Sequence, residues 1–170
     1  RDDGLWDLEA VLVDTKYRDF PLATGVRKAG DPVHEMVLTV TIDTKCNVLA
    51  AHAESKWVPY PGHCDAIGPD YAKLVGLNLL QDFRRHLQAR LGGVHGCSHI
   101  TELAAVLPTA AVQAFADEVF KTRDTAHAAH HEDDAKPWQL DRCHALRSNG
   151  PAVEQYYPRW YEPKQRAAAK

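Results

Sequence analysis

The sequence lacks any apolar run near the roughly 20 residues that a membrane-spanning helix needs. It also has no surplus of basic residues, because 20 lysines and arginines are dispersed among 23 acidic residues, for a formal net charge of -3. This balance argues against a nucleic-acid partner and against a polybasic patch that would bind a membrane surface. A chain of 170 residues can bury a substantial core, and we expect 1–170 to form a single domain.

Cysteine is scarce: there are 4 in the chain, at positions far apart from one another. Scattered cysteines in a chain of this length are typical of a reducing compartment, so we expect a cytoplasmic protein with free thiols or a metal site. The sequence begins at Arg1, so a preceding segment is left open, and an oligomer is also left open.

Three segments in the first third of the chain have the two-residue periodicity of half-buried strands. They are 5–13, 33–42 and 48–57, and the last two are joined by turn-forming residues at 43–47. Short connections of this kind predict an antiparallel meander.

Helical patterns follow the strands. We expect a short helix over 69–76, an amphipathic helix over 79–91, and an apolar helix from Ser98 to Phe120 that Pro108 kinks or splits. Residues 121–137 carry almost no large apolar side chain and are interpreted as a polar linker. Asn149-Gly150 inside 138–161 predicts a C-terminal β-hairpin. The predicted fold class is therefore α+β, with an antiparallel sheet of three or more strands packed on two or three helices.

The most informative stretch is 92–103, where two glycines end one helix and Cys97 and His99 precede or begin the next. A cysteine at a helix N-terminus experiences the positive end of the helix dipole, which favours the thiolate, and a thiolate is both a nucleophile and a soft metal ligand. His99 suits either role, as a base or as a second ligand. Glu102 lies one helical turn beyond His99 and would orient it.

Other titratable groups stand at turns, where side chains from different segments converge. A mononuclear zinc or iron site would take Cys64, Cys97 and His99 as ligands, with a fourth ligand left open. The candidates for that fourth position are Asp65, Glu102, His34 and Cys143.

Two other functions compete with the metal site. In the first, Cys97 is the nucleophile of a hydrolase or transferase, His99 or His34 is the base, and backbone N–H groups at the helix start bind the oxyanion. In the second, the protein is a non-catalytic accessory or scaffold protein that carries a metal or cluster or docks on a partner enzyme.

Several motifs distributed over nearly the whole chain resemble those of a bacterial family catalogued as domain of unknown function 2889. They are Asp2–Glu9, Leu12–Lys16, Pro32–Met36, Leu74–Gly76, Gly92–Gly93, Gly96–Leu103, Cys143–Leu146 and Tyr157–Tyr161. The resemblance implies, loosely, a role in the catabolism of aromatic compounds. The substrate would then be a small aromatic or oxygenated intermediate, with the metal polarising its carbonyl or activating water and His34 as an acid–base group.

The order of elements is also similar to that of the IscU/NifU-type iron–sulfur scaffold. In that family a cysteine after the sheet and another at the last helix start help to hold zinc or a nascent cluster. Cys64 and Cys97 match these two by position, and Asp65 approximately matches the family's aspartate. No cysteine stands between residues 65 and 96, so the middle ligand is absent, and His99 or Cys143 would have to replace it.

Overall fold

The structure is a computed structural model that describes residues 1–122 and 135–163. It contains two compact units, Arg1–Ala114 and Phe115–Lys170, and each is described by itself. No helix among the described residues has the length and apolar character needed to cross a bilayer.

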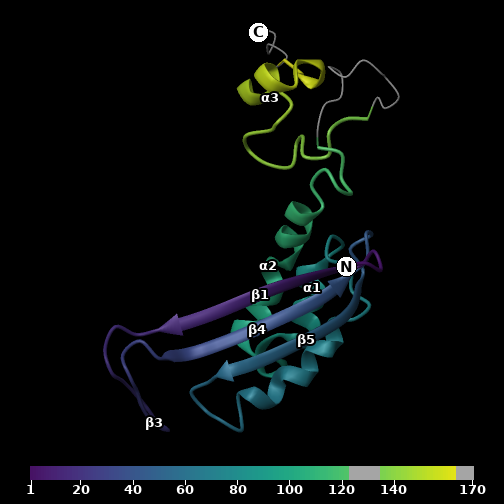
Figure 1. Ribbon diagram of the computed structural model, residues 1–170. Coiled ribbons are helices and arrows are strands. Elements are labelled where there is room, and N and C mark those ends of the chain that lie inside the picture. Colours follow the sequence, from purple (N-terminus) through teal and green to yellow (C-terminus); the bar gives the residue numbers. More distant parts are fainter. Residues whose placement is uncertain (123–134, 164–170) are drawn as a thin grey trace, which may run out of the picture. The chain divides into compact units, whose positions relative to one another are not determined.

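The first unit is built on a three-stranded antiparallel sheet with the order β1-β4-β5 (Figure 1). The strands are β1 (Trp6–Thr15), β4 (Pro32–Ile42) and β5 (Val48–Trp57), so the predicted strands and the antiparallel meander are confirmed. Alternate residues of the central strand β4 are buried, and Leu38, Val40 and Ile42 are each 0% exposed. Full burial of one such side chain contributes about 1.5–3 kcal/mol to folding.

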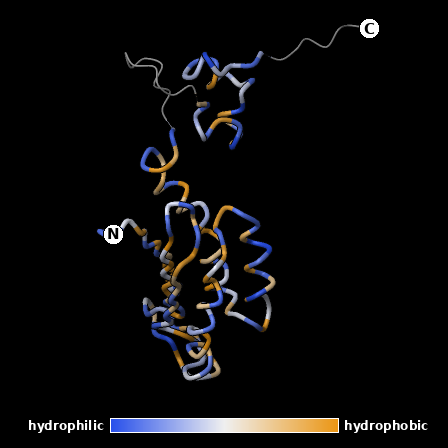
Figure 2. Tube along the Cα trace, turned by 90° about the vertical axis from the view of Figure 1, so that its right-hand side faces the viewer, coloured by the Kyte–Doolittle hydropathy of each residue, from blue (hydrophilic) through white to orange (hydrophobic). Residues whose placement is uncertain are grey.

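The helices of this unit lie on one face of the sheet (Figure 1). They are the 3-10 helix η1 (Asp65–Leu74), α1 (Phe83–Leu91), the 3-10 turn η2 (Gly93–His95) and α2 (Ser98–Ala114). Figure 2 shows apolar and polar positions interleaved along the strands and helices. Leu87 of α1 and Ile100 and Leu107 of α2 are fully buried. An antiparallel sheet packed on helices is the predicted α+β class, which is therefore confirmed.

The structure corrects several predicted boundaries. Between β1 and β4, where no strand was predicted, the chain contains a small hairpin of β2 (Phe20–Leu22) and β3 (Gly25–Arg27). The helix expected over 79–91 begins only at Phe83, because Asp82 adopts a left-handed conformation with φ 50°. The helix expected to reach Phe120 ends at Ala114, and Asp117 beyond it also has a positive φ, of 67°.

In the second unit the predicted hairpin over 138–161 is wrong. The segment instead contains helix α3 (Pro151–Tyr156) and the 3-10 turn η4 (Pro158–Trp160), and no described residue of 138–161 lies in a strand. The Asn149-Gly150 pair forms a turn in which the Gly150 N–H donates to the Arg147 carbonyl, 2.8 Å away. Pro151 then starts a helix, because its fixed φ suits the first helical position and its missing N–H is not needed there.

Aromatic stacking is prominent in the second unit. The rings of Phe120 and Trp138 are stacked with centroids 4.7 Å apart, and the Arg142 guanidinium lies 4.3 Å from the Trp138 centroid. Most of the predicted polar linker over 121–137 lies outside the described residues. The prediction of a single domain over 1–170 stays a prediction.

Candidate functional site

The candidate site begins at the end of the sheet, where β1 and β4 place Asp14 and His34 opposite each other. The His34 Nδ1 lies 3.2 Å from Asp14 Oδ2, and the His34 side chain is 15% exposed. Hydrogen bonds from Lys16 and then His34 keep the pKa of Asp14 below its usual value, so the carboxylate is charged. A charged carboxylate accepts a hydrogen bond from the His34 Nδ1–H, which leaves Nε2 as the nitrogen available for proton transfer.

The second part of the site is the start of α2. The Cys97 carbonyl accepts the first hydrogen bond of the helix, from the Thr101 N–H at 2.9 Å, so Cys97 directly precedes the helical turn. Its sulfur lies 3.8 Å from His99 Nδ1. A thiol and an imidazole this close are placed so that a proton can pass between them.

His34 and His99 join these two parts. Their ring centroids are 4.2 Å apart and their planes are inclined by 37°. Burial lowers the pKa of His99, and the nearby imidazole of His34 lowers it further. His99 is therefore held in the neutral form, which is the form that accepts a proton from a thiol.

His34, Cys97 and His99 line one cavity of about 440 Å³ in the first unit, a size typical of small-molecule sites. The remaining walls are mainly apolar, from Met36, Pro59, Tyr60 and Ile67. The full lining is His34, Met36, Pro59, Tyr60, His63, Cys64, Ile67, Gly96, Cys97, Ser98 and His99. All of these lining residues belong to the described part of the chain, and none is an aspartate, glutamate, lysine or arginine, so the cavity suits a neutral and largely apolar group.

The structure brings together some of the predicted site residues but not all. Cys64, Cys97, His99 and His34 line the same cavity. Glu102 and Asp65 are exposed and are not part of its lining. Cys143 is an exposed free thiol of the second unit.

The predicted metal centre stays a prediction. Four of the predicted ligands share the cavity, as the metal hypothesis requires. Within residues 1–122 and 135–163, however, no group of three or more His, Cys, Asp or Glu side chains is arranged to hold a metal ion.

The sequence reasoning missed two residues of the site. Asp14 was detectable, because an antiparallel meander places the end of one strand opposite the start of the next, where His34 stands. Tyr71, whose hydroxyl contacts the backbone of Cys97, gave no such signal, since a buried tyrosine in a short helix is ordinarily a core residue.

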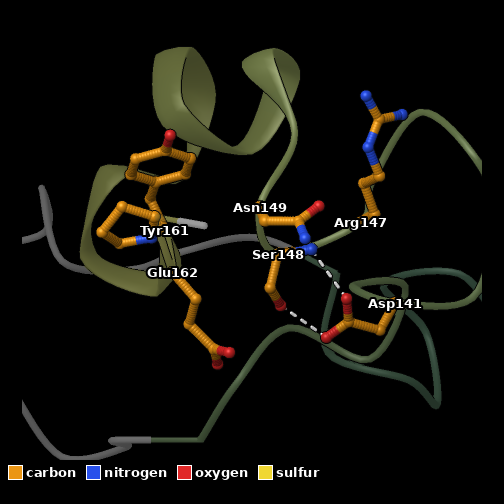
Figure 3. A pocket seen from close by; sticks show the side chains of 7 residues that line it. Asp141, Arg147, Ser148, Asn149, Tyr161 and Glu162 are labelled. Carbon is orange, nitrogen blue, oxygen red and sulfur yellow. Dashed lines mark hydrogen bonds between the residues drawn. The ribbon is translucent and has the colours of Figure 1, made fainter. Parts of the chain in front are cut away.

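A second cavity, of about 820 Å³, lies in the second unit between Asp141, Ser148, Tyr161 and Glu162 (Figure 3). The Ser148 N–H and hydroxyl both donate to the Asp141 carboxylate, and hydrogen bonds from Lys136 and Ser148 lower the pKa of Asp141. Figure 3 shows that the Arg147 guanidinium points away from this cluster. The Ser148 hydroxyl and the Asp141 carboxylate hold a loop together, and neither a thiol nor an imidazole is among the described residues that line this cavity, so the candidate site is the cavity of the first unit.

Fold and cavity together define a small α+β protein with a site of thiols and imidazoles. The chain belongs to the family described as Protein of unknown function (DUF2889), whose model matches residues 1–113. The matched range contains every residue that lines the candidate cavity. No curated protein and no solved structure matches this chain, and the similarity to IscU-type scaffolds therefore has no support.

Proposed function

We propose that this protein is a cysteine-dependent hydrolase or transferase that acts on a small, apolar acyl substrate. The observation that carries the proposal is the 3.8 Å contact between Cys97 Sγ and His99 Nδ1 inside a cavity with apolar walls. Aromatic or oxygenated acyl groups of modest size fit the same description.

In the first step, the Cys97 thiol gives its proton to the neutral His99 while the sulfur attacks the carbonyl carbon. The bond from the acyl carbon to the leaving group then breaks, and the leaving group takes the proton from His99. The product is a thioester on Cys97.

Water or another acceptor next attacks this thioester. The attacking molecule gives a proton to an imidazole, and the Cys97 sulfur leaves and recovers a proton, so the enzyme returns to its starting state. His34 is the cavity imidazole whose ring lies against His99, and its contact with Asp14 orients it for a proton transfer of this kind.

The oxyanion formed in each step needs hydrogen-bond donors. The N–H groups of the first turn of a helix have no partner within the helix. Those of Ser98 and His99 lie next to the nucleophile, in residues that line the cavity, and we assign the oxyanion to them.

The test is acylation of the whole chain by p-nitrophenyl butyrate, followed by peptide mass spectrometry. We expect one butyryl group on Cys97 that disappears in Cys97→Ser and persists in Cys143→Ser, the control with an exposed thiol. His99→Gln is expected to slow acylation by about 100-fold, a typical contribution of general-base catalysis. Equal labelling of Cys97 and Cys143, or an unchanged rate in His99→Gln, would contradict the proposal.

A metal-binding function is the second candidate, because Cys64, Cys97, His34 and His99 line one cavity and are the ligand types that zinc or iron accepts. Asp14 would then orient His34 from behind. The metal would be either catalytic or carried by an accessory protein.

Elemental analysis of tag-free protein, repeated after dialysis against zinc, separates the thiol chemistry from the metal-binding function. About one metal ion per chain, lost in both Cys97→Ser and Cys64→Ser, supports the metal, and none after dialysis rejects it.

A further inference from the structure

Tyr71 lies in η1, is 0% exposed, and directs its hydroxyl at the backbone of the proposed nucleophile. Its oxygen accepts a hydrogen bond from the Cys97 N–H at 3.0 Å. The same oxygen lies 2.9 Å from the Cys97 carbonyl and 2.8 Å from Thr101 Oγ1. One buried side chain therefore contacts both polar backbone atoms of Cys97.

The hydrogen bonds of this cluster leave the Tyr71 hydroxyl proton two acceptors. The Thr101 hydroxyl donates to the Leu91 carbonyl at 3.2 Å, so the single Tyr71 proton goes to Cys97 O or Thr101 Oγ1. Burial raises the pKa of Tyr71, which therefore stays protonated at neutral pH. The cluster links η1, the end of α1 and the start of α2 in one fixed arrangement.

Gly96 restricts the same backbone one residue earlier. A Cβ at this position would lie 2.3 Å from the Leu91 carbonyl oxygen and 3.1 Å from Thr101 Oγ1. The chain therefore passes directly against the end of α1 just before Cys97. The close contact at Gly96 and the Tyr71 hydroxyl bound to Cys97 together leave the Cys97 backbone little freedom.

We propose that Tyr71 is a positioning residue, which occupies the Cys97 N–H and so assigns the oxyanion to the N–H groups of Ser98 and His99. The inference rests on the proposed thiol chemistry. Tyr71 is not among the residues that line the cavity, so its hydroxyl would influence the reaction through the backbone of Cys97. Without the hydroxyl, the Cys97 N–H is freed while the Cys97 carbonyl still accepts from the Thr101 N–H, so the peptide bond before Cys97 would rotate and the donors of the first turn would shift with it.

The experiment compares two reactions of Cys97 in Tyr71→Phe and in the wild-type chain. Acylation by p-nitrophenyl butyrate forms an oxyanion, whereas alkylation by iodoacetamide does not. We expect acylation to fall by about tenfold or more, as when an oxyanion donor is displaced, and alkylation to change by less than about threefold. Tyr157→Phe is the matched control, because its hydroxyl accepts a hydrogen bond from Gln139 in the second unit.

A purely structural role would leave both rates of the folded fraction unchanged, and that result in Tyr71→Phe overturns the inference. If Tyr71→Phe does not fold, Thr101→Val replaces it, since this change removes a direct partner of the Tyr71 hydroxyl. Acylation by Thr101→Val at the wild-type rate would then overturn the inference, and a selective loss of acylation that Thr101→Ser restores would support it. Failure of the proposed function looks different, because the wild-type chain itself would then not be acylated at Cys97.

Discussion

The imidazoles of His34 and His99 lie side by side at a centroid separation of 4.2 Å with their planes tilted by 37°, although one belongs to a strand and the other to a helix. Two positively charged rings this close repel each other, so the pair favours states with at most one added proton. The pair therefore keeps a neutral imidazole beside Cys97 over a wider range of pH than an isolated histidine would.

Replacing His34 with asparagine is expected to raise the pKa of His99. His34 is the second cause of the lowered value, after burial, so the pKa should move toward the ordinary 6.5 without reaching it. The measurement is the Cε1–H chemical shift of His99 against pH, assigned with His99→Gln. His52→Asn, at an exposed position of β5, is the control. An unchanged or lower pKa of His99 in His34→Asn would show that the rings do not interact as described.

The same lowered pKa makes stability depend on pH. Because His99 binds its proton less readily in the folded state, the unfolded chain binds more protons as the pH falls below 6.5. The contribution of neutral His99 to the free energy of unfolding is therefore fully present above about pH 6.5. It is lost as the pH falls through the lower pKa of the folded state. Urea unfolding of wild type and His99→Gln at pH 5 and pH 8 checks this. The free-energy difference between them should favour the wild type more at pH 8, and the reverse order would refute the assignment.

Asp14→Asn tests the role of the carboxylate behind His34. Asparagine retains the shape but loses the charge that fixes the proton on His34 Nδ1, and outer carboxylates of this kind typically contribute about 10–100-fold. We expect hydrolysis of the Cys97 thioester, the step assigned to His34, to slow by about tenfold at pH 7, when followed by mass spectrometry as loss of the butyryl group. Asp14 also pairs with Lys16, so Lys16→Met is the matched control that removes the other partner. If Lys16→Met slows the reaction as much as Asp14→Asn, the carboxylate acts through the lysine and not through His34.

Much of the first unit could be predicted because its periodicity is strong. Leu38, Val40 and Ile42 alternate with threonines and are all buried, and the turn at 43–47 specifies an antiparallel return. The predicted start of the helix over 79–91 was wrong because local hydrogen bonding and backbone conformation oppose the helical periodicity there. Leu79 and Leu80 fit the helical pattern, but Asn78 caps the Leu80 N–H and Asp82 takes a left-handed conformation, so α1 begins later.

The site was predictable only where residues of known chemistry stand at turns. Cys97, His99, Cys64 and His34 were identified in this way and share the cavity. Glu102 was selected from helical spacing, but an exposed position on the same helix does not bring it into the cavity. The C-terminal hairpin failed because Asn-Gly is also compatible with the turn that precedes a proline-initiated helix, here at Pro151.

Gly96→Ala should be among the most damaging single substitutions in this unit. The added Cβ would lie 2.3 Å from the Leu91 carbonyl oxygen, a backbone atom that ends α1 and cannot move without disturbing that helix. We expect a loss of about 2–4 kcal/mol in the free energy of unfolding, measured in urea, because overlap with backbone forces a shift of packed elements. Gly93→Ala is the control: its Cβ meets nothing within 4 Å, and placing alanine at its φ of +59° costs only about 1 kcal/mol of stability.

Since the displaced backbone carries Cys97, the folded fraction of Gly96→Ala should also lose acylation while that of Gly93→Ala retains it. Equal stability of the two variants would mean that the close approach of Gly96 to α1 does not hold the nucleophile in place.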